Sequence, residues 1–193
     1  MEPLAQRPDG LTLLRISTPE QGEPWRAAFA GAYQEVWSEP PYNERFSSEE
    51  AGAVLPRALR IPDQITLLAV RDSGVVAGFA MAFPVGSKAD VVRDIRGLLP
   101  IDETFYFAEL GIMEQWRQTG LGKQLIELRL QLIDRTRFTH VILRTSATRN
   151  AAYEMYKRLG FEDTGVYTEV ASRRNDGSFR TDRRLFMAKV LGG

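Results

Sequence analysis

Apolar residues recur along the chain with two different spacings, and each spacing predicts one type of secondary structure. Apolar side chains three or four positions apart predict amphipathic helices at 20–36, 51–59, 121–132 and 149–159. Short runs of β-branched and aromatic residues, bounded by Gly, Pro, Asp or Ser, predict strands at 11–16, 65–71, 75–83, 104–113, 140–145, 166–171 and 184–190. The pattern is weakest in residues 85–103, where only a short helix at 90–98 is expected.

The order of these elements indicates the fold class. The strand–helix–strand succession over 104–145 requires a right-handed crossover, which makes its two strands parallel neighbours. A hairpin joins the strands on either side of Asp72-Ser73-Gly74. We therefore expect an α/β fold with a mixed, mostly antiparallel sheet of about seven strands, one parallel β-α-β crossover and flanking helices. Residues 1–10 are expected to be a flexible tail and residues 11–193 a single domain.

The composition excludes several classes of chemistry. The 193 residues contain no cysteine and one histidine, His140, so thiolate nucleophiles, disulfides, Ser-His-Asp triads and histidine-rich metal sites are excluded, and we expect no metal. The 25 basic and 25 acidic residues balance, which argues against nucleic-acid partners and anionic membrane surfaces. Apolar runs are too short to span a bilayer, and the first ten residues lack the apolar core of a signal peptide. We expect a cytoplasmic protein.

The junction between the predicted strand at 104–113 and the helix at 121–132 has the features of an anion site. It reads Gln-Trp-Arg-Gln-Thr-Gly-Leu-Gly over residues 115–122. The start of a helix carries unpaired N–H groups and about half a positive charge, which attract phosphate oxygens. Glycines let a bulky anion approach the main chain closely, and Arg117 can add a charged contact. The alternative is a plain strand–turn–helix corner in which glycine only relieves crowding.

The spacing of this loop resembles one known phosphate-binding motif and differs from two others. A P-loop requires G-x-x-x-x-G-K-[ST] and a dinucleotide-binding fold requires G-x-G-x-x-G, and neither is present. The segment from Arg117 to Gly122 resembles the acyl-CoA pyrophosphate loop of the GNAT superfamily of N-acetyltransferases, R/Q-x-x-G-x-G/A. Leu110-Gly111-Ile112 stands where L-A-V is usual in that family, and Glu114 departs from a frequent proline.

The resemblance covers almost the full length and implies acetyl-CoA as cosubstrate. The cofactor-binding residues that it implies are Leu110, Gly111, Ile112, Arg117, Gln118, Thr119, Gly120, Leu121, Gly122, Lys123 and Asn150. Asn150 lies one position later than the asparagine that contacts pantetheine in many members. An equally good alternative role for Asn150 is capping the helix that follows it.

A second motif places a tyrosine where the chemistry needs an acid. Tyr156 lies in a segment that resembles the family's A-x-x-L-Y-x-x-x-G-F, with Ala152 and Met155 at the alanine and leucine positions. The resemblance implies that this tyrosine protonates the departing sulfur. A thiol has a pKa of about 8.5 and a phenol of about 10, so the phenol stays protonated at neutral pH and can donate to the thiolate. The alternative is a core tyrosine on an amphipathic helix.

Glu109 is the candidate general base. It lies within an otherwise apolar strand, where burial is expected to raise its pKa, and simple alternation places it on the face of Phe107 and Gly111. The alternative is an ion pair with an arginine such as Arg144.

The expected function is transfer of acetyl from acetyl-CoA to a primary amine by direct attack in a ternary complex, with a small molecule or a peptide as acceptor. The resemblance gives as candidates for the acceptor pocket Trp37, Tyr42, Asn43 and Phe46. An alternative function is a non-catalytic acyl-CoA-binding or sensing module. The protein is expected to be a monomer or a homodimer.

Overall fold

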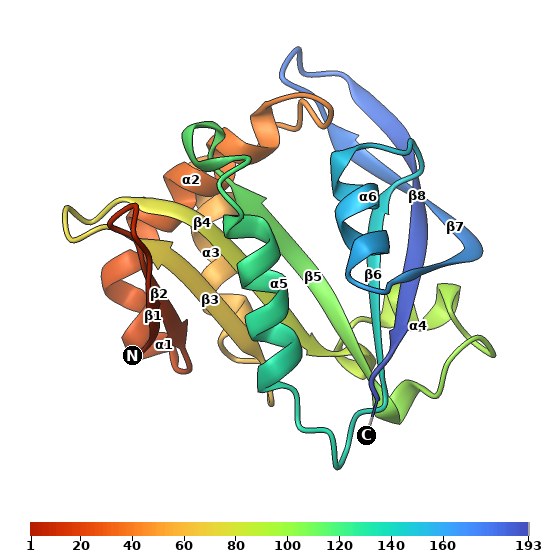
Figure 1. The fold of residues 1–193 in the computed structure, drawn as a ribbon. Helices are drawn as coiled ribbons and strands as arrows, with labels where there is room; N and C mark the ends of the chain where they lie inside the picture. The colour runs from red at the N-terminus through yellow and green to blue at the C-terminus, as the bar shows by residue number, and fades with distance from the viewer. Residues whose placement is uncertain (193) are drawn as a thin grey trace.

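Eight strands form one continuous sheet in the computed structural model, which describes residues 1–192 (Figure 1). The strands are β1 (Glu2–Gln6), β2 (Thr12–Ile16), β3 (Ile65–Val70), β4 (Val76–Pro84), β5 (Thr104–Ile112), β6 (His140–Ser146), β7 (Glu162–Arg173) and β8 (Phe179–Val190). Their order is β1-β2-β3-β4-β5-β6-β8-β7, and only β5 and β6 pair in parallel among the described residues. The predicted fold class is confirmed, with one strand more than expected.

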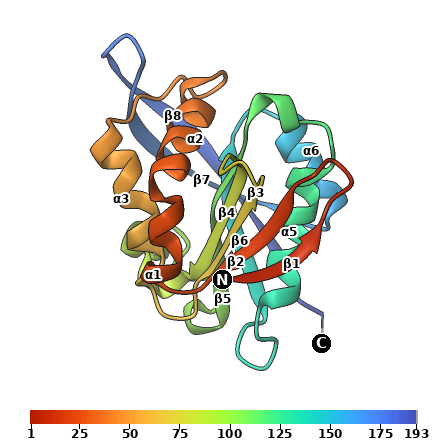
Figure 2. The same ribbon diagram turned by 90° about the vertical axis from the view of Figure 1, so that its left-hand side faces the viewer.

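Helices cover both faces of this sheet (Figure 2). They are α1 (Pro19–Gly22), α2 (Arg26–Ser38), α3 (Ser48–Ala58), α4 (Ala89–Asp94), α5 (Leu121–Leu132) and α6 (Ala151–Arg158). One core cluster lies between the sheet and α2 and α3, and a second lies between the sheet and α5 and α6. Within residues 1–192, no helix combines the length and the apolar character that crossing a membrane requires.

The extra strand lies in the segment that was expected to be a tail. β1 pairs antiparallel with β2 across the turn at residues 7–10, where Gly10 has a φ of 81° and the Arg7 amide donates to the Leu11 carbonyl at 2.8 Å. β1 is a short edge strand of sequence Glu-Pro-Leu-Ala-Gln, in which adjacent apolar residues and a proline replace the alternation by which a strand is detected in sequence. The expectation of a loose segment over residues 1–10 is therefore corrected.

A β-bulge interrupts the pairing of β4 with β5. Met81 lies opposite Glu109, whereas its neighbour Ala82 lies opposite Phe107, so Ala108 is an extra residue on β5. An extra residue reverses the alternation of the side chains that follow it. This bulge determines which face of the sheet each later residue of β5 reaches.

β5 and β6 separate at the same level. Their parallel pairing covers only Thr104–Phe107 against His140–Leu143, although both strands continue beyond it. Figure 1 shows the two strands diverging above this point, with α5 in front of β5 and α6 in front of β6. The parallel crossover predicted from the sequence therefore opens into a gap between the two strands.

Candidate active site

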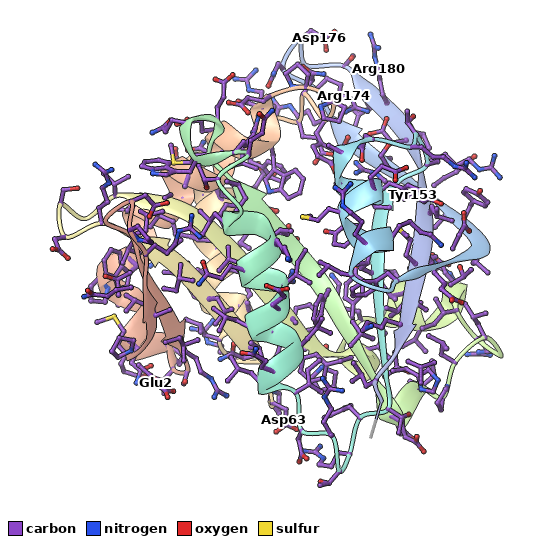
Figure 3. The ribbon with its side chains drawn as sticks, in the orientation of Figure 1. Glu2, Asp63, Tyr153, Arg174, Asp176 and Arg180 are labelled. Carbon is purple, nitrogen blue, oxygen red and sulfur yellow. The ribbon has the colours of Figure 1, made fainter. Side chains whose placement is uncertain are left out.

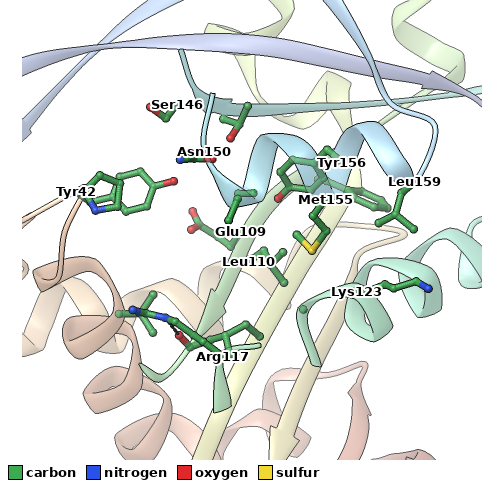
Figure 4. Close-up of a pocket in the computed structure, with 18 of the residues that line it drawn as sticks. Tyr42, Glu109, Leu110, Arg117, Lys123, Ser146, Asn150, Met155, Tyr156 and Leu159 are labelled. Atoms are coloured by element: carbon green, nitrogen blue, oxygen red, sulfur yellow. Dashed lines mark hydrogen bonds between the residues drawn. The ribbon is translucent and has the colours of Figure 1, made fainter. Parts of the chain in front are cut away.

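A cavity of about 1110 Å³ lies in the gap between β5 and β6 (Figure 4). Its walls come from the end of β5, the loop before α5, the end of β6, and α6. The segment that links α2 to α3 adds Pro40, Pro41 and Tyr42 on the remaining side. Segments distant in sequence thus meet around one space, and most of the predicted site residues lie on its wall.

The loop before α5 presents a row of free backbone donors. The Arg117 amide donates to the Glu114 carbonyl and the Gln124 amide donates to the Gly120 carbonyl, both at 3.0 Å. Between them, the N–H groups of residues 118–123 have no acceptor within residues 1–192. Gly120 has a φ of 83°, a left-handed conformation that glycine adopts without strain, and α5 begins directly after it. Free amides and a helix dipole are both features that attract anions.

Arg7 in the β1–β2 turn holds this loop from behind. Its Nη2 donates to the Thr119 carbonyl at 3.0 Å and its Nη1 to Oε1 of Gln124 at 2.5 Å. Because a trans peptide is planar, a Thr119 carbonyl turned toward Arg7 turns the Gly120 N–H the opposite way. Gly120 lies on the cavity wall, so this N–H is directed to the cavity side. No sequence signal pointed to Arg7, since it lies in a polar segment without periodicity.

Arg117 connects the loop to the opposite side of the cavity. Its Nε donates to the Ile112 carbonyl at 3.0 Å, and its Nη2 forms an ion pair with the Glu39 carboxylate in the α2–α3 linker. The Arg117 side chain remains 39% exposed, so its guanidinium is accessible to an anion in the cavity. Figure 4 shows Arg117 beside the loop, across the cavity from α6.

Tyr156 reaches the cavity from α6. Asn150 begins this helix by accepting a hydrogen bond from the Tyr153 amide at 3.1 Å, which confirms its capping role. It also lines the cavity, and its contact with pantetheine stays a prediction. The Tyr156 ring packs edge-on against Phe161 at 5.7 Å, and its hydroxyl points into the cavity (Figure 4). Burial raises the pKa of Tyr156 to about 12, with the nearby Arg129 cation opposing this rise. The phenol is therefore a proton donor at neutral pH.

Glu109 lies on the other face from the one that simple alternation predicted. It shares the face of its cross-strand partner Met81, toward α2 and α3, whereas Phe107 belongs to the core beneath α5. The prediction that Glu109 and Phe107 share a face is wrong, because the bulge at Ala108 reverses the alternation. The prediction that Glu109 and Gly111 share a face holds, since both follow the bulge.

The environment of Glu109 favours its neutral form. Burial raises the pKa of Glu109 to about 7, while the positive charges of Lys88 and Arg144 oppose the rise. Arg144, the arginine considered as its partner, pairs instead with Asp90 at 3.2 Å and donates to the Tyr106 hydroxyl at 3.0 Å. Glu109 lines the cavity and can accept a proton at a pH near neutrality.

The structure brings ten of the thirteen predicted site residues to this cavity. They are Glu109, Leu110, Ile112, Arg117, Gln118, Gly120, Gly122, Lys123, Asn150 and Tyr156. The other three lie off its wall. A side chain at Gly111 would meet the Phe79 ring, Leu121 is 1% exposed in the core, and Thr119 lies on the side of Arg7. The amide of Leu121 still belongs to the free row, so it contributes through its backbone alone.

Two of the four acceptor-pocket candidates lie on the cavity wall and two do not. Trp37 and Tyr42 line the cavity. Asn43 instead accepts a hydrogen bond from the Asn175 amide at 3.0 Å, and Phe46 packs against Tyr33 with ring centroids 5.0 Å apart. The sequence also gave no signal for the cavity positions of Arg129, Arg144, Ser146 and Thr148.

A partly buried ionic network holds the α2–α3 linker against the β7–β8 hairpin. Arg184 pairs with Glu44 at 2.9 Å and stacks 4.6 Å over the Tyr42 ring, while Arg174 pairs with Asp182 at 2.6 Å and donates to the Tyr42 carbonyl. Figure 3 shows Arg174 where the hairpin meets the linker. Partners in this network stand up to 140 positions apart in the chain. No short sequence motif predicts these pairs.

Comparison with known proteins agrees with the geometry. The sequence model of the "Acetyltransferase (GNAT) family" matches residues 23–161, and the chain belongs to this family. The mouse protein "N-acetyltransferase family 8 member 3" is 38% identical over 84 residues, which cover 42% of this chain and 37% of the mouse protein. The alignment thus spans well under half the length of that relative.

Two solved structures illustrate the shared fold. The ribosomal-protein-alanine N-acetyltransferase from Brucella melitensis superimposes with a TM-score of 0.66 at 18% identity, covering 93% of this chain and 99% of that one. The Arabidopsis thaliana NAA60 structure in complex with acetyl-CoA gives a TM-score of 0.63 at 19% identity, covering 95% and 99%. At this level of identity the likeness shows the fold alone.

Proposed function

We propose that the protein is an acetyl-CoA-dependent N-acetyltransferase that acetylates a primary amine by direct transfer. The observation that carries this proposal is the convergence of three groups on one cavity. These are the unpaired amides of residues 118–123, the Tyr156 hydroxyl and the Glu109 carboxyl. Each supplies something that the reaction needs, and they come from three different elements.

The cavity fits acetyl-CoA at the end formed by the loop. The row of free amides and the Arg117 guanidinium suit the pyrophosphate, and Lys123 lies on the same wall. A Cβ at Gly122 would lie 3.7 Å from Ile112 Cγ1. The absence of a side chain at Gly122 therefore leaves space along this part of the cavity wall. The edge of β5 beyond Phe107 has no paired strand toward β6, which leaves backbone groups near Leu110 and Ile112 for the pantetheine arm. When bound, acetyl-CoA supplies an acetyl group activated as a thioester.

The residues of the chain would then divide the proton transfers. Glu109, in its ionised form, takes a proton from the acceptor amine, whose nitrogen forms the new bond to the acetyl carbon. Tyr156 donates its proton to the sulfur as the carbon–sulfur bond breaks, and the products are the amide and free coenzyme A. Glu109 faces α2 and Tyr156 comes from α6, so the amine and the thioester approach from different sides. The α2–α3 linker, with Trp37 and Tyr42, borders the path of the amine.

Release of free thiol from acetyl-CoA tests the proposal across a panel of small amines, amino acids and peptides. Replacing Tyr156 by Phe should lower kcat by about 100-fold, in the range that general acids contribute, and change the Kd for acetyl-CoA by less than about threefold. Tyr153→Phe is the matched control, because Tyr153 is equally buried on the same helix but lies off the cavity wall.

Other outcomes of this assay separate the alternatives. If the protein binds acetyl-CoA but releases no thiol in the presence of any class of amine, a non-catalytic acyl-CoA-binding module would be favoured. An equal loss of kcat in Tyr153→Phe and Tyr156→Phe would assign Tyr156 to packing.

A further inference from the structure

Arg129 is a buried cation at the inner wall of the candidate site. It lies on α5, and 1% of it is exposed. Its hydrogen bonds go to backbone carbonyls, and its Nη2 is buried without a partner in residues 1–192. Burial lowers the pKa of Arg129 to about 10, so the side chain still carries its charge at neutral pH. A buried charge is expensive to desolvate, and Leu or Met could fill the same space at lower cost.

The contacts of Arg129 coincide with the β-bulge. Its Nη1 donates to the Met81 carbonyl at 3.2 Å and to the Glu109 carbonyl at 3.1 Å, and these two residues face each other where the register shifts. Its guanidinium lies 4.1 Å over the ring of Phe107, the residue just before the bulge. A bulge disrupts the ladder of hydrogen bonds between its strands, and here one guanidinium joins both strands at the disruption.

The same helix serves two parts of the site. α5 begins at the free amides of the loop, and Arg129 lies about 12 Å further along it, at 1.5 Å per residue from Leu121. The bulge that Arg129 contacts is the feature that turns Glu109 toward α2 and leaves Leu110 on the side of α5. One rigid element therefore connects the cofactor end of the cavity with the strand that carries the candidate base.

We propose that Arg129 is a positioning residue that clamps the bulge of β5 and so sets the side from which Glu109 meets the acceptor amine. The proposal rests on the proposed transferase function for its catalytic consequence, whereas the clamp itself is a property of the folded chain. A lysine can keep the charge and donate to carbonyls, but its ammonium has no planar group to stack on the Phe107 ring while it does so. A methionine fills similar space and keeps neither property.

Arg129→Lys and Arg129→Met test the clamp, with Arg137→Met as control because Arg137 is an exposed arginine that pairs with Asp63. Hydrogen exchange of the amides of residues 107–112 should quicken about tenfold or more in both Arg129 variants and stay unchanged in the control. For turnover, Arg129→Met should lower kcat about 30-fold, Arg129→Lys should lower it less, and both should keep the Kd for acetyl-CoA within about threefold.

These readouts separate failure of this proposal from failure of the proposed function. Unchanged exchange in the Arg129 variants overturns the clamp, and faster exchange with unchanged kcat overturns its role in positioning Glu109. A wild-type protein that transfers no acetyl group refutes the transferase function, while the exchange measurement still decides the clamp. Should Arg129→Met not fold, Arg129→Lys supplies both measurements.

Discussion

The two ends of the cavity are built by different means. The cofactor end is made of backbone: amides of residues 118–123, the free edge of β5 and the start of α5. The acceptor end is made of side chains from distant segments, held by the ion pair of Arg184 with Glu44 and by the contacts of Arg174. A binding site of main-chain groups depends on local conformation, whereas a site of packed side chains depends on the whole fold.

This difference has a consequence for how each end tolerates change. At the cofactor end most of the groups on offer are backbone groups, and the glycines matter because the absence of a side chain is required there. The Arg117 guanidinium is the main side-chain contribution. At the acceptor end, the walls include Trp37 and Tyr42, and the carboxylate of Glu109 is the proposed base. Substitutions at the acceptor end should therefore alter turnover and acceptor preference, and substitutions in the loop should alter cofactor affinity.

Glu109→Gln should give the largest effect on catalysis, and it should lower turnover without weakening acetyl-CoA binding. Loss of a general base is expected to lower kcat by about 100-fold on the high-pH plateau. Because burial raises the pKa of Glu109 to about 7, wild-type kcat/KM should rise with pH until about 7 and then level off. The variant should lose this inflection and keep its affinity for acetyl-CoA. Glu114→Gln, an exposed carboxylate at the cofactor end, is the control.

Glu109→Gln should also change the free energy of unfolding, which can be measured without an activity assay. A carboxyl with a raised pKa binds its proton more tightly in the folded protein, so its stabilising contribution is present below about pH 4.5 and is lost as the pH rises to about 7. Above that range, Glu109→Gln should be more stable than wild type by at most about 3 kcal/mol, and near pH 4.5 the two should agree. Denaturant unfolding at both pH values measures this. Equal stability at high pH would show that Glu109 is solvated as an ordinary carboxylate.

Gly122→Glu should give a smaller effect, confined to cofactor binding. A new carboxylate in the first turn of α5 would repel the pyrophosphate and weaken acetyl-CoA binding by about 30-fold, which corresponds to about 2 kcal/mol. The stability of the folded protein should not fall, because a Cβ at Gly122 makes only ordinary contacts and an acidic residue at the start of a helix is favourable.

The control is Gln131→Glu, which adds the same charge to an exposed position near the other end of α5. Isothermal titration with acetyl-CoA and a thermal shift without it measure the two properties separately. Equal affinities of the two variants for acetyl-CoA would show that the loop does not bind the cofactor.

The parts of the fold that the sequence predicted are those that local patterns determine. The crossover from β5 through α5 to β6, the loop at 117–122 and the helix carrying Tyr156 all follow from spacing within short segments. β1 was missed because this short edge strand contains a proline and no apolar–polar alternation. The side reached by Glu109 was missed because the bulge at Ala108 arises from the pairing of β5 with β4, and a single strand does not reveal it.

The acceptor end shows the limit of local reasoning most clearly. Glu44 and Arg184 are ordinary charged residues in the sequence, and only the docking of the β7–β8 hairpin on the linker makes them a partly buried ion pair. Arg129 likewise reads as a polar position of an amphipathic helix, although it is among the most buried residues of the protein. In each case the physical role comes from partners that no spacing rule connects.

Glu39→Gln should give the smallest effect, and it tests whether the two ends act independently. The ion pair of Arg117 with Glu39 is the side-chain link between the loop and the linker, and both partners are partly exposed. Such pairs contribute at most about 1 kcal/mol, so releasing Arg117 should tighten acetyl-CoA binding by about fivefold or less. Glu35→Gln, one turn earlier on α2 and exposed, is the control.

Salt dependence distinguishes the reason for any gain in affinity. If the pyrophosphate competes with Glu39 for Arg117, the advantage of Glu39→Gln should shrink as salt screens the pair. The acceptor KM should stay unchanged when the linker is held by its own contacts with Arg174 and Arg184. A shift in acceptor KM without a change in the Kd for acetyl-CoA would mean instead that Arg117 serves to position the linker, and the division between a backbone end and a side-chain end would then fail at this residue.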